Sequence, residues 1–146
     1  MRSLSVPRTL VTLFGASALA AAAMLSYAQM EKTPAPDGAK VYIISPEDGA
    51  TVSSTFTVVF GLEGMGVAPA GVQTANTGHH HLLVNGESPD MNMPLGAQVT
   101  HFGGGQTQTT LTLEPGEHTL QLILGDHLHV PHNPPVVSDQ ITVTVR

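Results

Sequence analysis

Histidine offers the most reactive chemistry in this sequence, and its spacing predicts metal binding. The 146 residues include eight histidines, which are His79, His80, His81, His101, His118, His127, His129 and His132. In an extended strand alternate side chains point to one side, about 7 Å apart. The pair His79 and His81 can therefore share one metal ion. His127 and His129 have the same spacing.

Two other segments could supply further ligands. Three prolines stiffen residues 130–135 around His132 and would preset its ring at little entropic cost. His101 precedes a run of three glycines that permits close approach of the backbone. Imidazoles that lie close together resist protonation, because the positive charges of their protonated forms would repel each other. In the neutral form they can bind a divalent ion instead. We therefore predict a metal site with ligands drawn from His79, His81, His101, His129 and His132.

The residue types indicate copper first and zinc second. Imidazole suits copper, zinc and nickel, and thioether sulfur favours reduced copper. Met65, Met91 and Met93 could provide thioethers, although methionine more often fills gaps in packing than binds metal.

A second hypothesis gives the histidines a structural role. A neutral imidazole can bridge two loops, because it has one hydrogen-bond donor and one acceptor. His80 and His118 share strand parity with Leu82 and Leu120, so we expect both to be structural. On this alternative the protein is a structural or interaction module that contacts a cell-wall or protein partner.

Catalytic patterns are weak, so we predict a binding module rather than an enzyme. The chain has no cysteine, and neither Ser88 nor Ser138 lies in a nucleophile-elbow motif. We assign no catalytic residues and no organic cofactor. A zinc or copper enzyme stays open, for example a three-histidine zinc hydrolase with Asp126 or Glu87 as the base.

Short apolar segments separated by turn residues must position these histidines. Phe56, Val58, Phe60 and Leu62 alternate with polar or small residues, and no segment has a sustained helical period. The expected strands are 41–44, 55–62, 80–84, 99–102, 107–113, 118–124 and 141–145. Residues 107–113 and 118–124 are predicted to form a hairpin around the turn 114–117. About seven strands at this spacing are typical of an immunoglobulin-like antiparallel β-sandwich.

The first residues of the chain indicate export. Residues 1–28 resemble a signal peptide, with Arg2 and Arg8 before an apolar run and small residues before Gln29. Residues 29–40 are predicted to be a flexible lead-in and 41–146 the folded domain. The run is short for a bilayer span, so we expect a periplasmic protein with no stable membrane span after processing, and a retained anchor as the lesser alternative.

The charge balance excludes some partners. Beyond the leader, eleven acidic residues face only Lys32, Lys40 and Arg146, which leaves eight net negative charges. Nucleic acid is therefore not an expected partner, since its phosphates would be repelled. A metal ion or an unidentified envelope protein is expected instead.

Several motifs together resemble a known bacterial family. These are residues 61–71, Thr77 to Leu83, His101 to Thr107, Pro115 to Leu122, Leu124 to Asp126 and residues 129–138. They are similar to the family called domain of unknown function 4399 over nearly all of Val41 to Arg146. The resemblance implies an exported, single-domain β protein without an established activity. It places the family's motif histidines on His79, His80, His81, His101, His118, His129 and His132, and leaves His127 outside the motif.

Overall fold

A computed structural model of the chain describes residues 31–146. The chain divides into two units, Met1–Met30 and Glu31–Arg146, and only the second is described. The expected signal peptide, residues 1–28, lies outside the described residues. Within residues 31–146 there is no helix of the length and apolarity that a membrane crossing requires.

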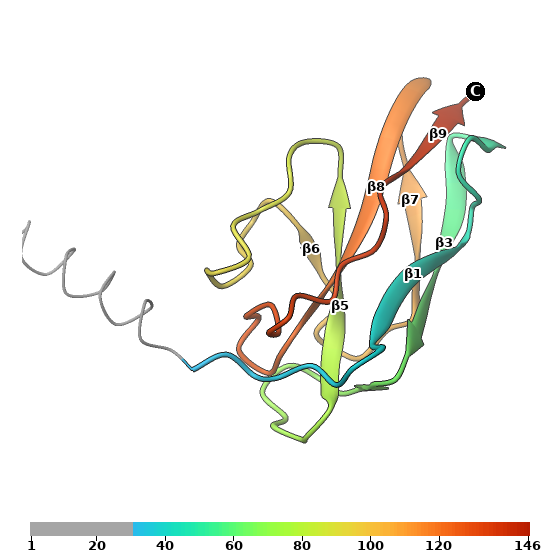
Figure 1. Ribbon diagram of the computed structural model, residues 1–146. Coiled ribbons are helices and arrows are strands. Elements are labelled where there is room, and N and C mark those ends of the chain that lie inside the picture. The colour runs from blue at the N-terminus through green and yellow to red at the C-terminus, as the bar shows by residue number, and fades with distance from the viewer. Residues whose placement is uncertain (1–30) are drawn as a thin grey trace, which may run out of the picture. The chain divides into compact units, whose positions relative to one another are not determined.

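The described residues form a two-sheet β-sandwich (Figure 1). Its nine strands are β1 (Lys40–Ser45), β2 (Thr51–Val52), β3 (Thr55–Glu63), β4 (Gly66–Val67), β5 (Thr77–Val84), β6 (Thr100–His101), β7 (Gln108–Thr112), β8 (Gly116–Gly125) and β9 (Ile141–Val145). One sheet has the order β1-β3-β7. The other has the order β2-β9-β8-β5-β4, with β6 also paired to β5. The predicted fold class is confirmed, and the two short strands β2 and β4 add parallel pairings that the sequence pattern did not predict.

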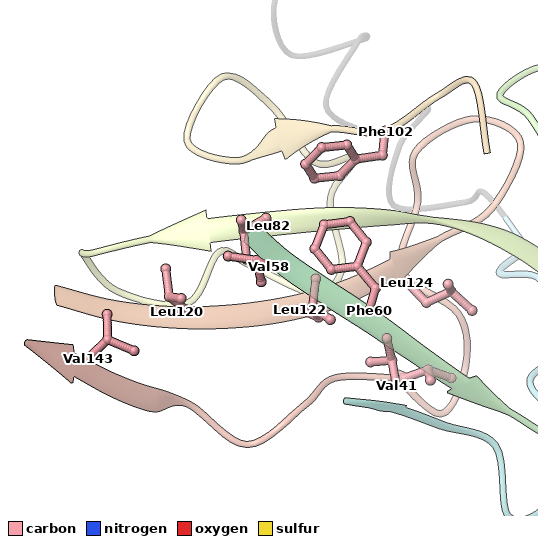
Figure 2. Packing of buried hydrophobic residues seen from close by; sticks show 10 residues of the cluster. Val41, Val58, Phe60, Leu82, Phe102, Leu120, Leu122, Leu124 and Val143 are labelled. Atoms are coloured by element: carbon pink, nitrogen blue, oxygen red, sulfur yellow. The ribbon is translucent and has the colours of Figure 1, made fainter. Parts of the chain in front are cut away.

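Alternating apolar side chains fill the space between the sheets. Val58 and Phe60 of β3 pack with Leu82 of β5 and with Leu120 and Leu122 of β8 (Figure 2). All five are at most 4% exposed. Burying each such side chain stabilises the fold by about 1.5–3 kcal/mol. The period of two seen in the sequence therefore reflects one sheet face turned toward the core.

The predicted hairpin between residues 107–113 and 118–124 is wrong. β7 pairs with β3, where Phe56 lies opposite Leu111, whereas β8 pairs with β5 and β9. Residues 113–115, between β7 and β8, therefore carry the chain from one sheet to the other. Leu111 and Leu120 still pack on the same core. An alternating pattern gives the same burial to a hairpin and to a crossing between sheets, so it could not distinguish them.

A second, smaller apolar cluster lies on the other face of the six-stranded sheet. Leu83 of β5 and Ile123 of β8 pack there with Leu95 and Val99. Leu95 and Val99 belong to residues 85–99, which connect β5 to β6. This long loop covers the outer face of the sheet, and His79 and His81 of β5 lie on the same face.

Residues 31–39, in the segment expected to be a flexible lead-in, make defined contacts. The amide of Ala35 donates to the carbonyl of Asn133, and the amide of Asn133 donates to the carbonyl of Thr33, each at 3.0 Å. In Figure 1 this blue segment runs beside the loop that follows β8. Hydrogen bonds therefore hold this segment to the domain from Lys32 onward.

Candidate metal centre

The three consecutive histidines of β5 divide between the two faces of the sheet. His80 points into the core, where its ring lies 5.1 Å from that of Phe60. His79 and His81 point the opposite way, and their ring centroids are 4.5 Å apart. All three residues are fully buried. The parity predicted from the spacing is thus present, and it places two imidazoles together on the outer face.

Two further histidines reach the same place from different parts of the chain. β6 pairs with β5 so that His101 lies directly opposite His81. His129 comes from the loop after β8, where it has a φ of 64°. That left-handed conformation is uncommon for a residue with a side chain. Here it directs the imidazole of His129 back over the sheet toward the other three rings.

The other three rings each place a nitrogen close to Nδ1 of His129. His129 Nδ1 lies 2.9 Å from His79 Nε2, 3.2 Å from His81 Nε2 and 3.1 Å from His101 Nδ1. A neutral ring nitrogen has either one proton or one lone pair, so it makes one good hydrogen bond. Three nitrogen neighbours exceed that capacity and bring lone pairs together. A shared cation would relieve this repulsion.

The distances from His129 Nδ1 to its three neighbouring nitrogens are compatible with ligands of one small ion. Zn–N bonds of about 2.0–2.1 Å place tetrahedral ligand nitrogens about 3.3 Å apart, close to the three distances from His129 Nδ1. One ring nitrogen each from His79, His81 and His129 all lie within 4.8 Å of one another. These three histidines can hold a metal ion, and His101 Nδ1 lies 3.1 Å from one of their nitrogens, His129 Nδ1.

The outer hydrogen bond of His101 fixes which of its nitrogens faces the cluster as a lone pair. Its Nε2 lies 2.9 Å from the carbonyl oxygen of Gly96. Because a carbonyl only accepts, Nε2 has the proton and donates it. In the neutral ring Nδ1 is then unprotonated and points at His129. A ligating histidine commonly donates its other N–H to such a carbonyl.

Burial lowers the pKa of three rings of the cluster, those of His79, His81 and His129. It is the main cause that lowers the pKa of His79 to about 4, with the charges of His129 and His101 adding to the effect. Burial likewise lowers the pKa of His81 to about 3, with further contributions from His79, His101 and His129. The pKa of His129 is also lowered, first by burial and then by His101. These three rings are therefore uncharged at neutral pH, and the neutral imidazole is the form that binds metal.

Comparisons with known proteins place the chain in a family. The family model described as domain of unknown function (DUF4399) matches residues 58–146. The chain belongs to this family. The match covers β5, β6 and the loop after β8, so the DUF4399 region includes all four converging histidines.

The other comparisons with known proteins give no further information on the function of the chain. No curated protein matches the chain. One solved structure, an endo-beta-1,4-mannanase from Thermotoga petrophila, is similar with 19% identity and a TM-score of 0.46. The similarity covers 74% of this chain and 20% of the mannanase chain, and it is too distant to bear on function.

One of the five histidines predicted as ligands, His132, lies apart in this DUF4399 domain. Its Nε2 is 3.1 Å from the carbonyl oxygen of Thr77, and its Nδ1 is 3.4 Å from that of Leu124. The ring also packs against Gly78, where an added Cβ would lie 2.9 Å from its Cε1. His132 thus joins the loop after β8 to the start of β5. The neighbouring prolines flank this connection, and the ring of His132 lies apart from the other four rings.

Histidines expected to be structural have the corresponding contacts. His80 Nδ1 is 3.2 Å from the carbonyl oxygen of Gln106. In His118, Nε2 is 2.8 Å from the carbonyl oxygen of Glu114, and Nδ1 is 3.0 Å from Asn85 Nδ2. Both rings therefore join neighbouring segments of the DUF4399 fold.

The methionines considered as soft ligands have apolar surroundings where their packing is defined. Met65 packs against the main core, and Met91 packs against the outer cluster of Leu83 and Ile123. These contacts indicate gap filling, so the donor set that the structure supports consists of imidazole nitrogens.

Two supporting residues were not predicted from the sequence as parts of a metal site. A Cβ on Gly125 would lie 2.5 Å from His81 Cε1, so only glycine leaves room for that ring. Asp126, weighed above as a catalytic base, accepts hydrogen bonds from Thr33 and from the amides of Leu128 and Val130. Burial alone would raise the pKa of Asp126, but these bonds outweigh it and lower the pKa. In the sequence, the Gly125-Asp126 pair directly after an alternating apolar segment was the feature that could have indicated these two roles.

Proposed function

We propose that this protein is an exported metal-binding protein of the cell envelope, with His79, His81, His101 and His129 as ligands. The observation that supports the proposal best is the crowding of three ring nitrogens within 3.2 Å of His129 Nδ1. A metal ion satisfies all four nitrogens, whereas hydrogen bonds among neutral rings satisfy only some of them.

Copper is the first choice and zinc the second. Divalent copper binds nitrogen ligands more tightly than zinc does in the general affinity order of divalent metals. Zinc prefers a tetrahedral arrangement, with which the three distances from His129 Nδ1 are compatible. The two preferences compete at this site, so both ions belong in the test.

Binding is proposed rather than catalysis because of the number of ligands. Catalytic zinc sites commonly keep one open position beside three protein ligands, whereas sites with four protein ligands are closed. With His101 included, the cluster offers four nitrogens to one ion. Substrate would then have to displace a ligand.

The location is proposed from the leader sequence. Residues 1–28 have the charge, apolar run and small residues of a signal peptide. Fractionation of the producing cells tests this part separately. Recovery of the uncut chain from the cytoplasm would contradict export and leave the metal proposal untouched.

The central test is metal content and affinity. The protein is expressed with its natural leader, purified without a histidine tag, analysed for elements and then titrated with copper and zinc after chelation. We expect one ion per chain, and we expect His81→Gln to lose it, because glutamine is neutral, similar in size and a poor ligand. His118→Gln is the matched control, since His118 makes hydrogen bonds outside the cluster.

The opposite result favours the structural alternative. Sub-stoichiometric metal, with neither ion bound more tightly than about 10 µM, corresponds to roughly −7 kcal/mol, which scattered imidazoles can reach. Equal metal binding by His81→Gln and the unchanged protein would also reject the proposed ligands. The histidines would then serve only to join loops.

A further inference from the structure

The turn that presents His129 is organised by Asp126. One carboxylate oxygen, Oδ1, accepts from the amides of Leu128 at 2.9 Å and Val130 at 3.0 Å. The amide of Asp126 donates to the carbonyl of Val130, and that of His129 donates to the carbonyl of Asp126. Holding a residue with a side chain at positive φ costs on the order of 1–3 kcal/mol, so surrounding bonds must maintain it. Asp126 supplies several of those bonds.

The second carboxylate oxygen of Asp126 is held by a residue far away in the sequence. Thr33 Oγ1 donates to Asp126 Oδ2 at 2.7 Å, across 93 positions of chain. Asp126 is only 5% exposed, and a hydrogen bond to a carboxylate is stronger than one between neutral groups. Thr33 is itself fixed, since its carbonyl accepts from the amide of Asn133.

The neighbouring residue reaches the other loop near the site. Lys32 Nζ donates to the carbonyl of Met91 at 2.7 Å and to Asn92 Oδ1 at 3.0 Å. Met91 and Asn92 belong to the loop that covers the outer face of the sheet, and the amide of Leu95 in that loop donates to the carbonyl of His129. Residues 32–35, which we call the strap, therefore contact both loops that surround the cluster.

We propose that the strap is a positioning element for the metal centre. Thr33 holds Asp126, Asp126 holds the turn, and the turn sets the place of His129 Nδ1, around which the other three nitrogens gather. Metal affinity then depends on a segment that contributes no ligand. This inference rests on the proposed function, since it assigns Thr33 and Asp126 as positioning residues of the same centre.

A substitution at Thr33 distinguishes an effect of positioning from an effect of charge on metal affinity. Replacing Asp126 would remove a negative charge near the cation as well as the bonds to the turn. Thr33→Val removes only the hydroxyl, keeps the shape of the side chain and leaves the carboxylate in place. Thr33→Ser restores the hydroxyl. Thr55→Val is a matched control, because Thr55 makes a hydroxyl hydrogen bond of 3.1 Å to Thr112 in the opposite sheet.

The experiment measures copper and zinc affinity, together with the electron paramagnetic resonance spectrum of bound Cu²⁺, for the protein expressed with its natural leader. Supporting groups around metal ligands commonly change affinity 10- to 100-fold. We expect Thr33→Val to weaken binding about 10-fold and to alter the nitrogen signature of the spectrum. Thr33→Ser and Thr55→Val should stay within about twofold of the unchanged protein.

The possible results test the positioning role of the strap and the existence of the metal site separately. Absence of binding by the unchanged protein rejects the proposed function itself. Tight binding by the unchanged protein, with Thr33→Val within about twofold and with the same spectrum, overturns the strap alone. Should Thr33→Val fail to fold, Thr33→Ala removes the same hydroxyl with a smaller side chain, and unchanged affinity in that variant overturns the inference equally.

Discussion

Lowering the pH of the metal-free protein should destabilise it before its carboxylates titrate. The folded pKa is about 4 for His79 and about 3 for His81, against 6.5 in a solvated ring. Between pH 6.5 and about 4 the unfolded chain therefore binds protons at both positions, and the folded chain largely does not. Stability is fully present above the unfolded pKa and is lost as the pH falls toward the folded values.

The expected loss is large for a domain of this size. Each proton bound by the unfolded state alone costs about 1.4 kcal/mol per pH unit. Between pH 6.5 and 5 the two rings together give about 3 kcal/mol, allowing for their half protonation in the unfolded chain at pH 6.5. His80 and His129 also have lowered pKa values and act in the same direction. Small domains have only about 5–15 kcal/mol in total.

Urea unfolding at pH 8, 6.5 and 5, after chelator treatment, measures this loss as a change in the free energy of unfolding. His81→Gln should show about half the dependence attributed to the pair, because one of the two rings is gone. A free energy that stays within about 1 kcal/mol between pH 6.5 and 5 would refute the assignment of these rings as neutral and buried. Full dependence in His81→Gln would refute the role of His81.

Two further predictions concern residues around the cluster. Gly125→Ala should cost about 1–3 kcal/mol of stability and weaken metal binding, because its Cβ would collide with the His81 ring; urea unfolding and zinc titration measure both effects. Gly104→Ala, which would meet only the flexible side chain of Gln106, is its control, and equal effects in the two variants would disprove the steric argument. His132→Ala should cost about 2–4 kcal/mol by leaving a cavity while one metal ion per chain is retained in element analysis; a loss of the ion with unchanged stability would instead restore His132 as a ligand.

The sequence was informative wherever a short-range period decides the structure. Alternation in residues 55–62 and 141–145 predicted strands that the fold contains. The same period of two placed His79 and His81 on one face and His80 on the other. These features depend only on neighbours along one strand, so they can be read from one segment.

Features that depend on pairing between distant segments were beyond that reasoning. The path from β7 to β8 crosses between sheets, which the pattern of Leu111 and Leu120 does not reveal. His129 joins the cluster because a turn with positive φ redirects it. His132 does not join, although rigid prolines flank it. Rigidity was predictable, but the direction in which the rigid segment points depends on the strands on either side.

The position of His80 between His79 and His81 has a consequence for folding. A slip of β5 by one residue against β8 would turn His80 outward and bury the other two beneath the opposite sheet. Only one imidazole of the three would then remain with His101 and His129. If an ion is bound during folding, it would therefore stabilise the correct pairing of β5 with β8 over the slipped pairing. Metal binding would then favour the correct register of the two strands.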